Sequence, residues 1–201
     1  MNKKIILASA SSRRRELLSL ITDDFEIMTR EVDERSAETE MEGKGTPAVL
    51  ISQGLALLKA RAVFDDLSDE EKMRTLVIGA DTSVILDNEI FGKPKDKADA
   101  AKMLKRLSGR KHVVATGIAL ITSEKIKCFT EETLVEFFEL DTYQTDLIKR
   151  YCSTDEPYDK AGAYGIQNGG ALLVRKIDGD FSNVVGLPVS RLARELESVI
   201  Y

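Results

Sequence analysis

A chain of 201 residues with 43% hydrophobic and 31% charged side chains can bury a sizeable core, and its composition is that of a folded domain rather than a disordered chain. The formal net charge of -5 excludes a general attraction to nucleic acid or to an anionic membrane, so any bound anion must be held by a local basic cluster. His112 is the only histidine, which excludes a histidine-rich metal site and favours carboxylates with an oxygen-bound metal ion.

The N-terminal sequence and the two cysteines predict a cytoplasmic protein. The apolar run at 5–8 is too short for a signal peptide and is soon followed by three arginines. No apolar stretch approaches the length of a membrane-spanning helix, so no membrane partner is expected. Cys128 and Cys152 form no CxxC pair, which favours two buried, reduced thiols.

The pattern of apolar residues predicts alternating strands and helices. Residues 4–8 predict a buried strand and residues 13–18 a helix, whereas the acidic, glycine-punctuated stretch 31–45 predicts a mobile loop. Thr46 is an expected N-cap, with Pro47 at the first position of a helix that runs to about residue 64. The middle of the chain predicts a strand at 75–80 that continues at 83–86, a turn at 87–88, and a helix through Ala100 and Leu107 that stops at 108–109. Strands at 112–122 and 133–138 and a helix at 141–151 are expected next. The last part predicts a glycine-rich loop at 160–170, a strand at 171–177 and a helix after Pro188. This order predicts a mixed α/β fold with one domain over residues 1–201.

The segment from Ser9 to Arg15 is a candidate phosphate site. It leads into a predicted helix, and a helix N-terminus favours anions. Three arginines in that first turn interact unfavourably with the helix dipole, and a bound polyphosphate would make the interaction favourable. Arginine also binds phosphate oxygens in bidentate fashion. The alternative is that these arginines face water on an amphipathic helix.

Asp81 is a candidate metal ligand or proton acceptor. It follows an apolar strand and the two small residues Gly79 and Ala80, where α/β proteins usually bind ligands. A carboxylate there can bind Mg²⁺ or take a proton from water. Glu34 supplies a second carboxylate that could share a divalent cation with Asp81. The alternative for Asp81 is a strand-ending acid that accepts backbone hydrogen bonds.

Two further loops suit close approach of a ligand. Lys93 lies between Gly92 and Pro94, and the 159–167 segment surrounds Lys160 and Gln167 with small residues. The lysines could contact an anion and Gln167 could read the edge of a base; alternatively, both are ordinary surface loops. The chain has neither a GxxxxGK[ST] nor a GxGxxG motif, which disfavours a P-loop NTPase.

Taken together, these segments resemble the Maf family of septum-formation-inhibitor-like nucleotide pyrophosphatases. The matching stretches occur in the family's order and cover nearly the whole chain: LASASSRRRELL at 7–18, VDE at 32–34, LLKARAV at 57–63, VIGADTSVILDNEIFGKPKD at 77–96, MLKRLSGRKHVVATGIAL at 103–120, and EPYDKAGAYGIQNGGALLVRKIDGDFSNVVGLPVSRL at 156–192.

The resemblance implies a two-lobed α/β fold with a deep central cleft, similar to inosine triphosphate pyrophosphatases, and usually a homodimer. It implies hydrolysis of a nucleoside triphosphate between the α- and β-phosphates with Mg²⁺ or Mn²⁺. Asp81 matches the family's proton acceptor, and Glu34 matches a metal-associated acid. The phosphate-contacting or polar cleft positions are matched by Arg13, Arg14, Lys59, Lys93 and Lys160.

Three positions distinguish branches of the family. Branches that act on dTTP and UTP carry Arg, Thr and Gln, which are Arg13, Thr82 and Gln167 here. The branch that acts on 7-methyl-GTP has tryptophan at the position of Arg13, and this chain has no tryptophan. The resemblance therefore favours dTTP and UTP, including modified pyrimidines, in clearing the nucleotide pool, with 7-methyl-GTP as the alternative. One departure is Ser12, where family members usually have proline.

Two other classes of function compete with the enzyme. The family name suggests a nucleotide-responsive regulator of septum formation and cell division, which nothing in the sequence excludes. RNA binding through Arg13–Arg15 is disfavoured by the negative charge and by the lack of aromatic residues among those arginines.

Overall fold

The first strand, β1 (Lys4–Leu7), carries apolar side chains on both faces, as a strand covered on both sides requires. In the computed structural model, which describes residues 3–200, Ile5 and Leu7 pack into one core and Ile6 and Ala8 into another. The alternation follows from the two-residue period of a strand. The two cores place helices on both sides of the sheet, an α/β architecture.

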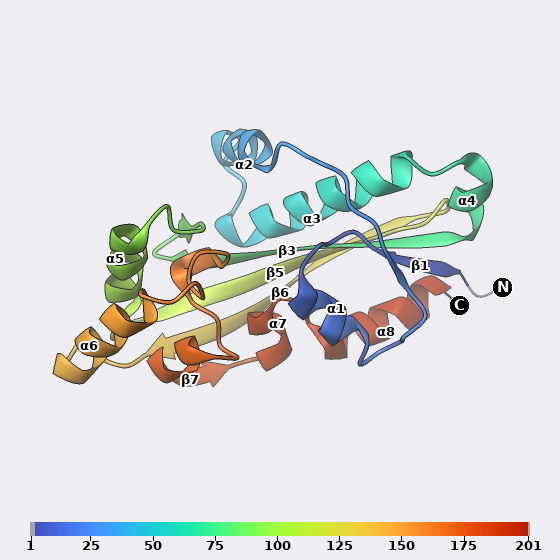
Figure 1. Cartoon of the computed structure of the whole chain (residues 1–201). Helices are drawn as coiled ribbons and strands as arrows, with labels where there is room; N and C mark the ends of the chain where they lie inside the picture. The colour runs from blue at the N-terminus through green and yellow to red at the C-terminus, as the bar shows by residue number, and fades with distance from the viewer. Residues whose placement is uncertain (1–2, 201) are drawn as a thin grey trace. The chain divides into compact units, whose positions relative to one another are not determined.

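The seven strands form one mixed sheet in the order β2-β1-β3-β5-β6-β7, with β4 paired to β3 (Figure 1). β1 is parallel to both β2 (Glu26–Ile27) and β3 (Thr75–Leu86). The antiparallel pairs are β3 with β4 (Glu89–Phe91) and β6 (Ile126–Phe137) with β7 (Val174–Asp178). The remaining strand, β5, spans Lys111–Ile121.

Contacts divide the chain into two compact units. The first contains 1–81, 116–131 and 186–201, and the second contains 82–115 and 132–185. Strands β3, β5 and β6 contribute residues to both. The predicted deep cleft and the predicted single domain over 1–201 stay predictions.

In the first unit, helices cover both faces of the sheet (Figure 1). The long helix α3 (Ala48–Asp65) lies on one face, with Ala56, Ala60 and Val63 packed against the strands. The helices α1 (Ser12–Leu18) and α8 (Val189–Ile200) lie on the other face through Leu18, Leu192 and Leu196.

Two strand glycines allow α3 to approach the sheet closely. A Cβ on Gly79 would lie 2.2 Å from the Ala56 carbonyl oxygen, and one on Gly117 would lie 2.2 Å from the Gln53 backbone nitrogen. Any side chain at either strand position would therefore displace the helix. This spacing sets the distance between α3 and β3.

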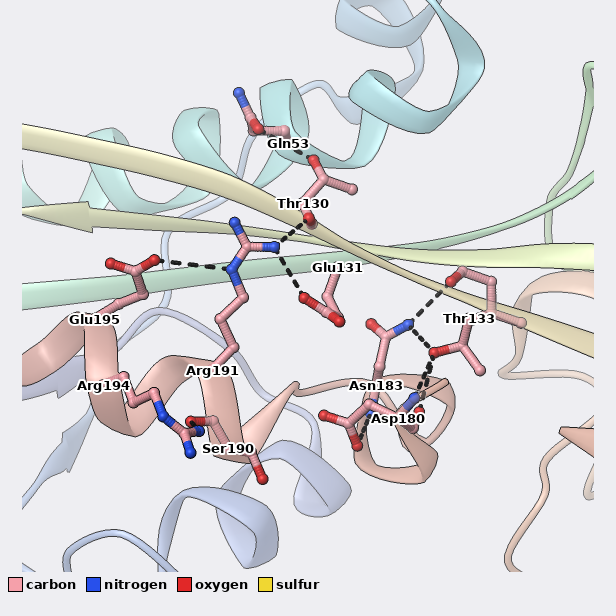
Figure 2. Close-up of polar contacts among 11 residues, drawn as sticks. Gln53, Thr130, Glu131, Thr133, Asp180, Asn183, Ser190, Arg191, Arg194 and Glu195 are labelled. Atoms are coloured by element: carbon pink, nitrogen blue, oxygen red, sulfur yellow. Dashed lines mark hydrogen bonds and ion pairs between the residues drawn. The ribbon is translucent and has the colours of Figure 1, made fainter. Parts of the chain in front are cut away.

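Polar side chains attach α8 to β6 (Figure 2). The Arg191 guanidinium donates to the Thr130 carbonyl oxygen at 2.8 Å and to the Glu131 carboxylate at 2.9 Å. It also lies 4.5 Å from the centre of the Phe129 ring, a cation–π distance. Helix α8 is therefore held to the sheet by polar and cation–π contacts in addition to its apolar face.

The second unit surrounds one apolar core with short elements. Asp87 and Asn88 have φ angles of 52° and 66°, the type I′ geometry that favours a two-residue hairpin between β3 and β4. The helices of this unit are α5 (Lys97–Leu107), α6 (Thr142–Tyr151) and α7 (Phe181–Val185), with short 3-10 turns at Ala161–Ala163 and Gly169–Leu173.

A buried asparagine ties α7 to the strands of this unit (Figure 2). Asn183 donates to the Val114 carbonyl oxygen and to the Thr133 hydroxyl, each at 3.0 Å. The same hydroxyl accepts a hydrogen bond from the Asp180 backbone at 3.1 Å. These contacts fix the chain just before residue 186, where it returns to the first unit.

Several predicted elements need correction. The acidic stretch 31–45 is not a loop, because it contains α2 (Glu34–Gly43), whose N-cap Asp33 accepts from the Ser36 backbone at 3.0 Å. The N-cap of α3 is Pro47 rather than Thr46. Strand β6 begins at Ile126 rather than 133, and a 3-10 turn replaces the start of the strand predicted at 171–177. The apolar pattern did not predict β2, α7 or the six-residue α4 (Asp69–Arg74).

Among residues 3–200, no helix is both long enough and apolar enough to cross a membrane. Both cysteines are free thiols, with Cys152 buried and Cys128 partly buried. Burial raises the pKa of each thiol, which disfavours the reactive thiolate.

Candidate active site

Asp81 lies at the point where β1 has ended and β3 continues. The last backbone bond between them runs from the Ala8 nitrogen to the Ile78 oxygen at 2.8 Å. Beyond it, Asp81 retains only 14% exposure of its side chain although it carries a carboxylate. The sequence pattern predicted Asp81 at the end of a strand. In the structure, β3 runs on to Leu86, and it is the neighbouring parallel strand β1 that stops.

Lys59 bridges Asp81 and Glu34. Its ammonium lies 2.7 Å from Asp81 Oδ1 and 2.8 Å from Glu34 Oε2. Asp81 belongs to β3, Lys59 to α3, and Glu34 is the first residue of α2. Three segments far apart in the sequence therefore bring one cation and two acids together, and the pairing of Asp81 and Glu34 around a metal ion stays a prediction.

The position of Lys59 follows from the packing of α3. Ala60, the next residue, is fully buried, and its Cβ would lie 2.8 Å from a Cβ on Gly79. Because α3 approaches the strand so closely, the lysine stem reaches Asp81, two residues beyond Gly79. Glu34 is held by the start of α2, where an acid also interacts favourably with the helix dipole.

Arg14 connects the first helix to two backbone segments of the same unit. Its guanidinium donates to the Ala80 carbonyl oxygen and to the Gly186 carbonyl oxygen, each at 2.9 Å, and to the buried Ser9 hydroxyl at 3.3 Å. Burial lowers the pKa of this guanidinium, and the Asp81 carboxylate opposes that shift. Arg14 thus supports the backbone just before Asp81, a contact that the sequence did not indicate.

Arg13 precedes Arg14 in the first turn of α1 and is partly buried. The Ser11 hydroxyl caps this helix by accepting from the Arg14 backbone at 3.4 Å. Ser9, Arg13, Arg14, Glu34, Lys59 and Asp81 all belong to the first unit.

The second unit holds the other candidate residues. Thr82 follows Asp81 in β3 and is partly buried, whereas Lys93 and Gln167 are exposed. The Gly162 nitrogen donates to the Gly92 carbonyl oxygen at 3.1 Å, so the two lysine-bearing loops are joined. Lys160 is engaged within its own loop, donating at 2.5 Å to the Glu156 carbonyl oxygen and to Asp159.

Two buried aromatic contacts hold the loop that carries Lys160 and Gln167. The Tyr164 hydroxyl lies 2.8 Å from His112 Nε2, and the Tyr151 hydroxyl accepts from the Gly165 nitrogen at 3.2 Å. His112 is 1% exposed, and its burial lowers the pKa of the imidazole to about 4. The sequence marked His112 only as the single histidine of the chain, whereas in the structure it is a buried, neutral support of this loop.

The comparisons with known proteins cover nearly the whole chain. The model of the Maf-like protein family matches residues 4–199. The chain is 48% identical over 195 residues to a dTTP/UTP pyrophosphatase of Bacillus cytotoxicus and 46% identical over 195 residues to one of Bacillus anthracis, with 97% of this chain and 95% of each relative covered. The chain belongs to the Maf family.

The fold is also similar to that of a solved structure, the Staphylococcus aureus Ham1 protein. The TM-score is 0.56 at 15% identity, with 98% of this chain and 100% of that chain covered. At this identity the likeness concerns the fold alone.

The departure from the Maf-family pattern at Ser12 has a structural explanation. Ser12 is the first residue of α1, the helix position that proline occupies most readily. Because Ser11 supplies the cap, the helix can begin here without the proline ring. The substitution therefore leaves Arg13 in the first turn.

Glu34 and Asp81 fit the divalent cation that the Maf family implies. Both offer hard oxygen ligands, and both already contact the same ammonium. Within residues 3–200, no group of three or more His, Cys, Asp or Glu side chains is arranged to hold a metal ion. Two acids suit an ion of the Mg²⁺ type, which keeps water ligands and shares substrate phosphates.

Glu38 is a further acid near this site that the sequence pattern did not single out. It lies one turn after Glu34 on α2, and burial followed by the charges of Glu42, Asp81 and Glu34 raises the pKa of its carboxyl. The i, i+4 spacing from Glu34 would have signalled a shared face, but only if the stretch had been recognised as a helix.

Replacing His112 with glutamine is expected to make the free energy of unfolding fall less steeply as the pH drops below neutral. The folded protein holds His112 neutral to about pH 4, whereas the unfolded chain protonates near its ordinary value of 6.5. The stability that depends on neutral His112 is therefore fully present above pH 6.5 and is lost as the pH falls toward 4. From neutral pH to about pH 5, the wild type should lose about 2 kcal/mol more than His112→Gln.

Urea unfolding of both proteins across that pH range measures this difference. Glutamine keeps a hydrogen-bonding group beside Tyr164, and every carboxylate titrates in both proteins, so their contributions cancel. Parallel stability curves for the two proteins would contradict a neutral, buried His112.

Proposed function

We propose that this chain hydrolyses dTTP and UTP, and modified pyrimidine nucleoside triphosphates, to the monophosphate and pyrophosphate, and so removes unwanted nucleotides from the pool. The observation that carries the proposal is the pair of relatives, 48% and 46% identical over 97% of this chain, whose names specify dTTP/UTP pyrophosphatase. The combination of Arg13, Thr82 and Gln167 supports the same substrates.

In the proposed reaction, Asp81 accepts a proton from water while the water oxygen bonds to the α-phosphorus. The bond from that phosphorus to the bridging oxygen breaks, and pyrophosphate leaves. Arg13, Lys59 and Lys93 stabilise the negative charge on the phosphate oxygens. Arg14 and Lys160 occupy further phosphate-contacting positions, and Ser9, Thr82 and Gln167 bind the substrate, with Gln167 at the base.

We further propose that Glu34 and Asp81 hold a divalent cation, Mg²⁺ or Mn²⁺. When bound, this ion neutralises phosphate charge and orients the triphosphate. The cytoplasmic location and the homodimer are also proposals, supported by the cysteine usage and by the Maf-family resemblance respectively. No nucleic-acid or membrane partner is proposed.

Pyrophosphate release from a panel of triphosphates tests the substrate. The panel contains dTTP, UTP, CTP, GTP, 7-methyl-GTP and ITP, each with Mg²⁺ or Mn²⁺. We expect kcat/KM for dTTP and UTP to exceed that for the purines by at least about 100-fold, because a hydrogen-bonding pocket rejects a mismatched base edge strongly.

The other outcomes of the panel separate the alternatives. A preference for 7-methyl-GTP would keep the enzyme and overturn the interpretation of Arg13, Thr82 and Gln167. Folded protein that turns over none of these nucleotides would contradict the enzyme and favour a nucleotide-binding regulator of cell division.

A further inference from the structure

The Lys59 ammonium occupies the space between the two acids that are proposed to hold the metal ion. It contacts Asp81 Oδ1 at 2.7 Å and Glu34 Oε2 at 2.8 Å. Its side chain is 17% exposed and that of Asp81 is 14% exposed, so this half of the cluster is largely shielded from water. A shielded ion pair is screened less by salt than a surface pair.

A divalent cation and this ammonium compete for the negative charge of the same two carboxylates. If the ion bound Asp81 and Glu34 while Lys59 stayed in place, the positive charges would lie within a few ångströms of one another at a site of low dielectric. The two carboxylates carry only two negative charges, and Lys59 already balances one of them. Metal binding is therefore disfavoured while the ammonium stays between the acids.

The displaced ammonium needs another anion. A partly buried lysine without a partner is costly, and the lysine stem is flexible enough to carry its charge to a new acceptor. In the proposed reaction that acceptor is the triphosphate. The divalent cation and the nucleotide then bind cooperatively, because each favours the state in which the Lys59 ammonium has left the two acids.

We propose that Lys59 lowers the affinity of Asp81 and Glu34 for divalent cations until a nucleotide binds. The Lys59 ammonium then moves from these two carboxylates to a phosphate. Lys59 is thus a counter-ion in the free protein and a substrate contact in the complex. The second half of this inference rests on the proposed function; the first half does not.

Binding of Mn²⁺ alone, followed by electron paramagnetic resonance, tests the first half directly. The wild type should bind Mn²⁺ weakly without nucleotide. Lys59→Met, which leaves the two acids without their cation, should bind Mn²⁺ at least about tenfold more tightly. Lys59→Arg keeps a cation between the acids and should bind as weakly as the wild type.

A matched control separates this local effect from the general loss of a positive charge. Lys44 pairs with Glu40 on α2 at 2.5 Å, in the same unit, but both side chains are about two-thirds exposed. Lys44→Met should therefore change the Mn²⁺ affinity by no more than about twofold. Thermal unfolding verifies that each variant is folded, and Lys59→Gln replaces Lys59→Met if the latter is not.

If the folded Lys59→Met protein bound Mn²⁺ no more tightly than the wild type, the inference would be wrong. An equal gain in Lys44→Met or Lys59→Arg would also overturn it. Turnover of dTTP is measured separately. A wild type that hydrolyses nothing, beside a Lys59→Met that binds Mn²⁺ tightly, would overturn the proposed function and leave the counter-ion role of Lys59 intact.

Discussion

Asp81→Asn is expected to lower the turnover number for dTTP by at least about 1,000-fold, because an amide cannot accept the proton from the attacking water. The change is nearly isosteric, and Lys59 keeps its contact with Glu34 at 2.8 Å. The variant should therefore stay folded, and the loss should appear in kcat at saturating nucleotide. Pyrophosphate release and a thermal unfolding curve on the same preparation measure both effects.

Asp66→Asn is the matched control for that experiment. Asp66 accepts from Arg30 at 2.8 Å in the same unit, so the substitution removes a carboxylate from an ion pair outside the candidate site. Its turnover should equal that of the wild type. A folded Asp81→Asn protein with near-normal turnover would exclude Asp81 as the proton acceptor.

The sequence predicted the elements whose apolar pattern is strong. Strands β1 and β3 contain strongly apolar runs, and the Asp87–Asn88 turn has the residues that positive φ angles favour. By contrast, α2 has no buried residue, so hydrophobic periodicity could not reveal it. The structure shows what supports it: the Asp33 cap and the packing of Met41 against Gly54 of α3.

The candidate residues could be proposed from the sequence, but their arrangement in space could not. Asp81 and the arginines could be chosen from chemistry and local pattern, whereas Lys59 came only from the family resemblance. Its contact with Asp81 spans 22 residues of sequence and depends on how closely α3 packs on β3. The His112–Tyr164 contact spans 52 residues and is equally invisible to local patterns.

Gly79→Ala is expected to be among the most damaging small substitutions in the first unit. The new Cβ would lie 2.2 Å from the Ala56 carbonyl oxygen and 2.8 Å from the Ala60 Cβ, both in fully buried residues. Relief requires α3 to move away from the sheet, which opens the core on that face. We expect a loss of about 3 kcal/mol of unfolding free energy and a fall in melting temperature of roughly 10 °C.

Urea and thermal unfolding of Gly79→Ala beside Gly43→Ala measure this effect. Gly43 ends α2, and a Cβ there would meet nothing within 4 Å, so alanine should be neutral or slightly stabilising. Equal stability of the two variants would contradict the close approach of α3 to the sheet.

A second substitution, this one in α3, identifies which contact destabilises Gly79→Ala. Ala60→Gly removes the Cβ at 2.8 Å but leaves the Ala56 carbonyl oxygen at 2.2 Å. Since that oxygen belongs to the helix backbone, no side-chain change can withdraw it, and Gly79→Ala should stay destabilised in the Ala60→Gly background. Because the same displacement draws Lys59 away from Asp81, the residual folded protein should also bind Mn²⁺ more tightly than the wild type, which links the packing of α3 to the closure of the acid pair.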